Sequence, residues 1–494
     1  GNITLANSER VHDSGVRDRN GRLAFDYDLG ENSSVFARAE AYSARNAGFG
    51  FIDPSKLGAG QPTIQILYPD QDYTRYSAGY RASALSVPFA DRAEFTLYSQ
   101  RNFRHLNQHI VIPAGPGATI TVNSFNYTDM ATFGGRLELA KSWGTKVLTY
   151  GLDAFRDRSR NTDTSQTDVV GFGPPSSQSS NVPSVPNATF ASAGAFAQFE
   201  MQPLSRLTTV FGVRGQTISS GTQVTPNSPT APISGNDRTA VWSANALYRL
   251  RSDLNLVGSV GRGFRSPNLV ERFFNGPTPE GSAYQRPNPD LLAETNLNVD
   301  LGVRFRRDAW YGEGFVFRNT TSNAIRAVAT GNTVSGLPEY ENENVGKERM
   351  DGVELLAGTR IVRGFDANVS YSRLLGKNIS NPGSPIGDTY SSKVVGDVTW
   401  SGLSDRVSAG YTARYQGEQK DVIVGANPIG SVLPSFVVHS ARAGVRLMRR
   451  NAMESRLTVA VDNIGNKLYA EFPNASFFRP EPGRSFSVAL TSSF

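Results

Sequence analysis

Residues 297–305 read LNVDLGVRF, and this stretch decides the fold class of the 494-residue chain. Every second residue from Leu297 to Phe305 is apolar, and the residues between them are polar, charged or glycine. Successive side chains of a β-strand point to opposite faces, so the stretch predicts a strand with one apolar and one polar face. Such an apolar face packs inside a soluble sandwich or propeller, or it faces the lipid around a transmembrane barrel.

The same alternation recurs along the chain and favours the barrel. It is found at residues 148–154, 365–372, 393–400 and 407–416. The runs at residues 297–305 and 407–416 match the length of a tilted membrane strand, roughly nine to eleven residues, whereas soluble strands usually have about five or six. In these segments the charged residues, such as Asp300 and Arg414, lie on the polar face. A charge facing lipid costs about 2–4 kcal/mol, so this segregation is expected of a membrane barrel.

The connections between strands alternate in length. Short turns are expected at residues 144–145, 203–206, 251–253, 363–364 and 402–405. Long polar connections are expected at residues 45–72, 106–128, 161–188, 216–238, 267–296, 378–390 and 417–435. Short turns at one rim and long loops at the other are typical of an outer-membrane barrel whose long loops face outward from the cell. We therefore predict an all-β, antiparallel transmembrane barrel of about twenty strands that ends at the terminal Phe494.

Composition excludes several other classes of protein. No run of about 18 apolar residues is present, which excludes membrane-spanning helices. The chain has no Cys, which excludes disulfides, thiol catalysis and thiolate metal sites. Its net charge of +6 comes from Lys and Arg scattered among Asp and Glu, so we expect no nucleic-acid partner. No grouping of His, Asp and Ser suggests catalysis, so we assign no catalytic residue and expect no enzyme.

Three segments carry a resemblance to a known family. Residues 261–274 read GRGFRSPNLVERFF, residues 288–303 read NPDLLAETNLNVDLGV, and residues 482–490 read PGRSFSVAL before the terminal Phe494. Together they resemble the C-terminal barrel of TonB-dependent outer-membrane receptors. The family motif residues are Phe264, Arg265, Pro267, Asn288, Pro289, Glu294 and Thr295. We expect these residues to set the strand ends and turns rather than to bind ligand, because Pro restricts φ and Asn-Pro favours a turn.

The resemblance implies a 22-stranded barrel filled by an N-terminal plug, preceded by a segment that binds the energy-coupling protein TonB. Residues 1–494 match only the barrel, so we expect the plug and the first two strands to be missing from this chain. The implied function is active uptake of a scarce ligand, foremost a ferric siderophore, by a monomer embedded in outer-membrane lipid. A transported iron chelate is then a ligand, and no cofactor is expected. The alternatives are a passive porin-like channel and a haem or cobalamin receptor of the same family.

Candidate ligand residues lie in the expected external loops. Siderophores are often anionic, and the basic residues placed at the mouth are Arg104, Arg158, Arg160, Arg272 and Arg286. Tyr284 is a candidate iron ligand as a phenolate. Residues 268–287 contain no His, which counts against haem.

Two further groups of residues raise the question of a metal site. His105 and His109 are four residues apart, which in a strand separates them by about 13 Å, so we expect polar rim residues rather than a shared metal. Asp157, Asp163 and Asp168 lack the spacing of a calcium loop, so a solvated loop is expected. We therefore assign no metal ligand.

Overall fold

The computed structural model describes residues 3–50, 63–229, 231–278, 283–334, 336–361, 364–383, 386, 392–419, 432–450, 453–471 and 480–493. The first half of the chain forms β1 (Arg17–Gly30), β2 (Ser33–Gly48), β3 (Thr63–Ala82), β4 (Arg92–Gly115), β5 (Ala118–Trp143), β6 (Lys146–Val170), β7 (Ser176–Ser180), β8 (Ala188–Leu204), β9 (Leu207–Thr222) and β10 (Ser234–Arg251). The middle forms β11 (Leu254–Arg265), α1 (Leu269–Phe273), β12 (Gly276–Pro277), β13 (Tyr284–Arg286), β14 (Glu294–Arg307), β15 (Trp310–Ser322), β16 (Ile325–Val334) and β17 (Leu337–Asn344). The last part forms β18 (Lys347–Ile361), β19 (Phe365–Asn378), β20 (Ser392–Gly402), β21 (Val407–Gln416), β22 (Phe436–Arg450), β23 (Met453–Asp462) and β24 (Ser485–Ser493).

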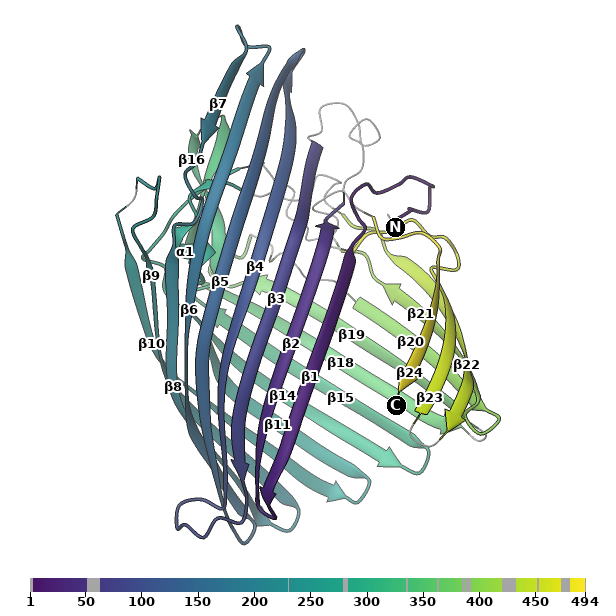
Figure 1. Ribbon diagram of the computed structural model, residues 1–494. Helices are drawn as coiled ribbons and strands as arrows, with labels where there is room; N and C mark the ends of the chain where they lie inside the picture. Colours follow the sequence, from purple (N-terminus) through teal and green to yellow (C-terminus); the bar gives the residue numbers. More distant parts are fainter. Residues whose placement is uncertain are drawn as a thin grey trace.

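These strands build one 20-stranded sheet, which confirms the predicted all-β architecture and strand number. The long strands pair antiparallel with their neighbours in the chain, from β1 through β6, then β8 to β11, β14, β15 and β18 to β24. The sheet curves around a central axis, and its edge strands are β1 and β24 (Figure 1). Among the described residues, β1 pairs only with β2, and β24 only with β23.

The two faces of the sheet differ as the alternation predicts. Leu301 lies opposite Gly258 on one side and Val316 on the other, and directly paired residues share a face. Leu301 is 60% exposed, and Leu297, Val299 and Val303 on the same face of β14 are exposed too. This face is the outer wall of the barrel, where the exposed apolar side chains contact lipid. The polar residues between them line the interior.

The short turns lie where they are predicted. The β5–β6 connection is residues 144–145, with Gly144 at φ +60°, and the β8–β9 connection is residues 205–206. Short turns also join β10 to β11 and β20 to β21. All of these turns lie at one end of the barrel, here called the short-turn end.

Two of the predicted long loops are wrong in part. Residues 106–128 are not a loop, because β4 continues to Gly115 and β5 starts at Ala118. Most of residues 161–188 is strand as well, since β6 continues to Val170 and β7 pairs with it. These strands rise above the rest of the sheet at the opposite end, the long-loop end (Figure 1). In this part of β4 the apolar residues Ile110, Val111 and Ile112 follow one another, so the period-two signal is interrupted there.

The long-loop end also carries a small second sheet and one short helix. The sheet contains β12, β13, β17 and β16. The helix α1 is five residues long and has a capping box, in which the Asn268 side chain accepts from the Glu271 N–H and the Glu271 carboxylate accepts from the Asn268 N–H. None of the described helices has the length and apolar character needed to cross a membrane. Phe494, predicted as the barrel terminus, lies outside the described residues.

Candidate functional site

A cavity of about 580 Å³ lies inside the barrel at the long-loop end. Its wall is made by the inward faces of β4, β5 and β6, and Val270 and Phe274 of the α1 segment close it from the opposite side. Tyr68 of β3 and Phe190 of β8 complete the wall. We call this cavity the mouth chamber. Its size is within the range of small-molecule sites, which hold about 300–1,000 Å³.

The polar groups of the mouth chamber are mainly amides and hydroxyls, set among apolar side chains such as Met130 and Phe190. The wall carries four amides, namely Asn102, Gln108, Asn126 and Asn161. Arg104 is the only basic residue among the described residues that line the chamber, and its guanidinium lies 3.4 Å from the Thr128 hydroxyl. Arg104 was predicted at the mouth and lines the chamber there, and its ligand role stays a prediction.

Two carboxylates also line the chamber, and both already have hydrogen-bond donors. Asp157 accepts from the Thr132 hydroxyl at 2.6 Å. Asp163 accepts from the backbone N–H of Ser184, also at 2.6 Å. The acidic groups are therefore bonded to the wall, while Arg104 is the charged donor still exposed to a ligand.

The two motif segments meet at the edge of the chamber. Arg265, at the end of β11, is the register partner of Glu294, at the start of β14. The Arg265 guanidinium donates to Glu294 at 2.6 Å and to Glu271 of α1 at 2.7 Å. Glu294 also accepts from the backbone N–H of Ile325 at 2.7 Å. These contacts tie two strands, α1 and β16 together, which supports the structural interpretation of the motifs.

The remaining motif residues have structural surroundings too. Phe264 is paired with Thr295 across the same ladder, and the side chain of Pro267 is fully buried. Asn288, which precedes Pro289, donates from its amide to the Asn342 carbonyl at 2.8 Å and accepts from the Asp290 N–H at 3.1 Å. The second contact is an Asx turn, which is the turn expected of an Asn-Pro sequence.

Arg272 is not a free cation at the mouth. Its side chain is 2% exposed, and its guanidinium donates to Asp237 at 3.0 Å, to the Ser220 hydroxyl at 2.8 Å and to the Leu291 carbonyl at 2.9 Å. A buried guanidinium with these three partners holds α1 against β9 and β10. As placed, it has no surface to offer an anionic ligand.

Arg286 and Tyr284 lie on β13, which pairs with β17. Arg286 forms an ion pair with Glu341. The Tyr284 hydroxyl donates to the Asn275 amide oxygen at 2.9 Å. Burial raises the pKa of Tyr284, and the nearby Glu339 carboxylate acts in the same direction. The neutral phenol is therefore favoured, which is the form that does not bind iron as a phenolate.

The two histidines predicted at the rim face away from the chamber. The His105 ring stacks on Tyr127 with 4.2 Å between centroids and has Nδ1 3.6 Å from the Asp70 carboxylate. His109 Nδ1 lies 2.7 Å from the Asn123 amide oxygen. Both residues lie on the outward face of β4, opposite to that of Arg104, because odd and even positions of a strand alternate.

Arg158 and Arg160, predicted as mouth cations, are also on the outward face. Both share the face of Leu152, a β6 residue that is 59% exposed on the outer wall. Both residues precede the loop expected at residues 161–188, and the prediction placed them at the mouth by their closeness to that loop, without using the direction of their side chains. In the observed strand β6, even-numbered residues such as Leu152, Arg158 and Arg160 point outward, because successive side chains alternate between the two faces.

The acidic cluster considered for calcium is separated by the fold. Asp157 and Asp163 face the chamber, whereas Asp168 is on the other face of β6 and is bonded to Gln166. No group of three or more metal-ligating His, Asp or Glu side chains occurs in the described part of the chain.

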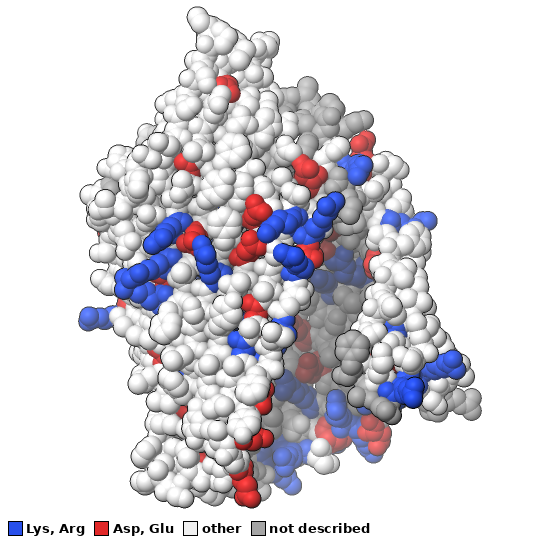
Figure 2. Space-filling model, viewed as in Figure 1, with Lys and Arg blue, Asp and Glu red and all other residues white. Residues whose placement is uncertain are grey.

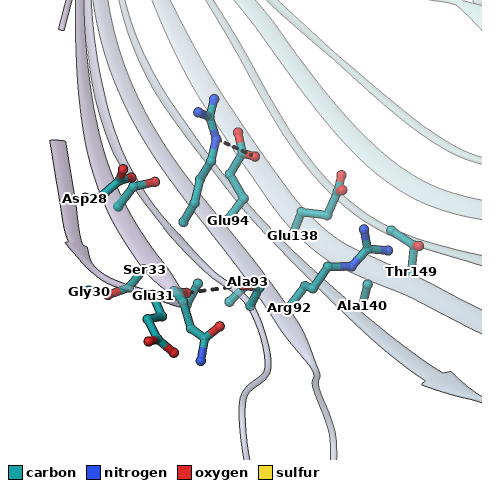
Figure 3. Close-up of a pocket in the computed structure, with 15 residues that line it drawn as sticks. Asp28, Gly30, Glu31, Ser33, Arg92, Ala93, Glu94, Glu138, Ala140 and Thr149 are labelled. Atoms are coloured by element: carbon teal, nitrogen blue, oxygen red, sulfur yellow. Dashed lines mark hydrogen bonds and ion pairs between the residues drawn. The ribbon is translucent and has the colours of Figure 1, made fainter. Parts of the chain in front are cut away.

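A second hollow of about 550 Å³ lies on the lumen wall at the short-turn end (Figure 3). Asp28, Arg92, Glu94 and Glu138 line it. The Glu94 carboxylate accepts from Arg81 at 3.2 Å. The lining comes from wall strands and a turn, and no described segment covers it as α1 covers the mouth chamber. We therefore take the mouth chamber as the candidate site.

Sequence reasoning missed most of the chamber wall. It singled out Arg104 but not its same-face neighbours Asn102 and Gln108, nor Asn126 and Asn161 on the adjacent strands. The available signal was whether a residue number is odd or even, because every second residue of a strand, here from Asn102 to Gln108, lies on the same face. Applying the alternation beyond the lipid-spanning segment would have found the β4 residues.

Comparison with known proteins agrees with this architecture. Residues 8–464 match the family model described as TonB dependent receptor-like, beta-barrel. The ferric enterobactin receptor PirA of Pseudomonas aeruginosa is 26% identical over 275 residues, which cover 51% of this chain and 36% of PirA. The ferrienterobactin receptor of Escherichia coli K12 is 32% identical over 126 residues, which cover 23% of this chain and 17% of that receptor.

A solved structure supports the fold independently. The copper transporter OprC superposes with a TM-score of 0.78 at 18% identity, over 100% of this chain and 74% of OprC. The matched parts of the two curated relatives are well under half of their lengths, so their ligands are not transferred to this chain here. The strand order, the two motif segments and the family match over residues 8–464 lead to one conclusion. The chain belongs to the TonB-dependent receptor family of outer-membrane β-barrels.

Proposed function

We propose that the protein takes up a ferric siderophore across the outer membrane in a process powered through TonB. The match to the TonB-dependent receptor barrel over residues 8–464 is the observation that carries the proposal. The similarity to receptors named for ferric enterobactin makes this iron chelate the first ligand to test. Coupling to TonB, through a segment outside the barrel, is part of the proposal, as is a monomeric receptor.

The mouth chamber suits the capture step. An anionic chelate entering from outside would meet the Arg104 guanidinium and the amide groups of Asn102, Gln108 and Asn126. A charged donor bonds an anion about twice as strongly as a neutral one. Tyr68 and Phe190 supply aromatic surface for the rings of a catecholate. The protein performs no covalent chemistry in this scheme, because binding gives selectivity and the energy for passage comes from TonB.

The experiment is radioiron uptake in a host without its own siderophore receptors, with the full-length protein expressed. Ferric enterobactin is supplied, and uptake is compared in the presence and absence of TonB. Uptake that requires both the protein and TonB supports the proposal. Uptake that continues without TonB indicates the porin-like alternative, and uptake of haem or cobalamin instead of the siderophore identifies the other family alternatives.

Arg104→Gln tests the chamber as the capture site. We expect affinity for ferric enterobactin to fall about tenfold, because one charge-assisted hydrogen bond is lost. The measurement is intrinsic fluorescence quenching on the purified receptor, alongside uptake. Arg307→Gln is the control, since Arg307 is exposed at the short-turn end and should leave affinity unchanged. Equal affinity of the Arg104 variant and the wild type would exclude this chamber as the capture site.

A further inference from the structure

A band of charged residues follows the outward face of β1 to β6, above the apolar wall (Figure 2). The strand register places Arg17, Arg45, Asp70 and His105 at successive paired positions on this face. Arg101 of β4 belongs to the same face and makes a bidentate contact to Asp129 of β5, with both N–O distances at 2.7 Å. The band lies toward the long-loop end, which in this family is the outer leaflet side of the membrane.

Part of the band is neutralised and part is not. Arg45 is 2.9 Å from Asp72 and 3.1 Å from Asp70, and Arg101 occupies both oxygens of Asp129. Arg156, Arg158 and Arg160 of β6 are exposed, and none of them forms an ion pair with another described residue. We call these three residues the β6 arginine row.

The β6 arginine row has a spacing that suits several phosphate groups. Alternate residues of a strand are about 6.8 Å apart, so the row is about 14 Å long. The register partners of Arg156 and Arg158 on β5 are Phe133 and Ala131, which carry no charge. The partner of Arg160 is Asp129, whose carboxylate is already bonded to Arg101. Among the described residues, Asp129 is thus a counterion shared between Arg160 and Arg101, and the row keeps an excess of positive charge that an external polyanion would neutralise.

The surface next to the row identifies the anion as part of a lipid. Phe133, directly opposite Arg156, is 63% exposed on the outer wall. Leu152 and Leu137, paired with each other further toward the short-turn end, are 59% and 36% exposed. A ligand that placed phosphates on the row would have its acyl chains along these side chains. A soluble anion would leave this apolar surface unused.

We propose that the β6 arginine row binds the phosphate groups of an outer-leaflet lipid, with the acyl chains packed on Phe133, Leu137 and Leu152. Arginine suits this role because its planar guanidinium makes paired hydrogen bonds to phosphate oxygens. The row is on the outer wall and the mouth chamber is inside the barrel, so this site is separate from ligand capture. The proposal rests on the family membership and the register, and it is independent of the transported ligand.

Native mass spectrometry of the detergent-purified receptor tests the proposal. The probes are bisphosphorylated lipid A, the same lipid after enzymatic removal of its phosphates, and inorganic phosphate. We expect the wild type to retain bisphosphorylated lipid A much more strongly than the dephosphorylated form. Inorganic phosphate at the same concentration should neither bind measurably nor displace the lipid. This part of the experiment uses only the wild-type protein, so its result does not depend on whether a variant folds.

The variant arm assigns the binding to the row. Arg156→Gln, Arg158→Gln and Arg160→Gln together should weaken lipid A binding roughly a hundredfold, since each basic residue near an anionic headgroup strengthens binding about fivefold. The three Lys substitutions should keep most of the binding, because they keep the charge. The matched control carries Gln at Arg251, Arg307 and Arg450, which are exposed near the short-turn end, and should bind as the wild type does.

Three results would overturn the proposal. The first is equal binding of the two lipid forms by the wild type. The second is equal binding of lipid A by the triple Gln variant of the β6 arginine row and by the control variant. The third is displacement of the lipid by inorganic phosphate. The first would show that acyl chains alone bind, the second that the phosphates bind elsewhere, and the third that the row is a general anion site. Heat-modifiable gel migration confirms in each case that the variant barrel is folded.

Discussion

At the scale of single residues, burial decides what a charge does. Arg272 and Arg286 are both arginines of the segment between β11 and β14, and the sequence assigned both to the mouth. Arg272 is 2% exposed and paired with Asp237, whereas the Arg286 side chain is 48% exposed beside Glu341. The two positions are 14 residues apart in one connection, so nothing in the local composition distinguishes them.

Arg272→Leu is expected to destabilise the mouth segment by about 3–5 kcal/mol, because it leaves the Asp237 carboxylate buried without its ionic partner. The measurement is protease cleavage of the segment between β11 and β14 as urea is raised. Arg286→Leu is the comparison and should cost about 1 kcal/mol or less, because its ion pair is half exposed. Similar losses in the two variants would contradict the burial argument.

Tyr284 should remain a neutral phenol throughout the physiological pH range. Burial raises its pKa above the ordinary value of about 10, so any stability that depends on the neutral form is present below pH 10, roughly, and is lost only as pH rises through the raised pKa. The measurement is the difference in ultraviolet titration between wild type and Tyr284→Phe. Added ferric ion should give no visible phenolate band that the Phe substitution removes. A band lost in the variant would restore the iron-ligand hypothesis.

At the scale of elements, the hairpin turns depend on backbone conformation rather than on contacts. Gly144 joins β5 to β6 at φ +60°, and a side chain built at this position would meet no other atom within 4 Å. Gly144→Val should therefore destabilise the barrel by about 1–2 kcal/mol through left-handed backbone strain alone. Urea unfolding in lipid vesicles measures the change. The control is Gly21→Val, because Gly21 has open space around it and an ordinary strand backbone.

The tall strands β4 to β6 show where element prediction loses its signal. Between Leu106 and Thr128 the alternation is interrupted, because Ile110, Val111 and Ile112 are apolar in succession. The strands persist because the β4–β5 ladder runs without interruption from Arg92 to Pro113, through Ile112 paired with Ile120. Cross-strand hydrogen bonds, which have no sequence period, extend the hairpin past the membrane.

At the scale of the whole molecule, the barrel is arranged inside out relative to a soluble protein. Its large apolar side chains are exposed on the outer wall, and charged groups such as Arg81, Glu94 and Asp26 line the lumen in contact with one another. The exposed fraction of an outer-wall residue therefore measures contact with lipid rather than with water.

Leu301→Arg should make folding into vesicles less favourable by about 2–4 kcal/mol, because it places a charge on the lipid face near the middle of β14. Asn298→Arg on the same strand faces the lumen and should cost much less. The measurement is reversible folding from urea into vesicles, followed by gel mobility. A larger loss for the Asn298 variant would mean that the two faces have been assigned in reverse.

The amino-acid sequence by itself determined the all-β class, the strand number, the short turns and the family. These properties follow from local alternation and from motifs that lie close together in the chain, such as the one between Phe264 and Pro267. The plug and the first two strands expected before residue 1 stay a prediction, because the barrel carries no information about them.

Only the tertiary structure decided the height of β4 to β6, the burial of Arg272, the chamber around Arg104 and the outward direction of Arg158 and Arg160. Each of these depends on which residues from distant strands become neighbours. Sheet register sets those neighbours through hydrogen bonds between backbones, and a register shift of one residue would move every side chain to the opposite face. The physical reason is that alternation specifies two faces, whereas pairing specifies which face meets lipid, lumen or ligand.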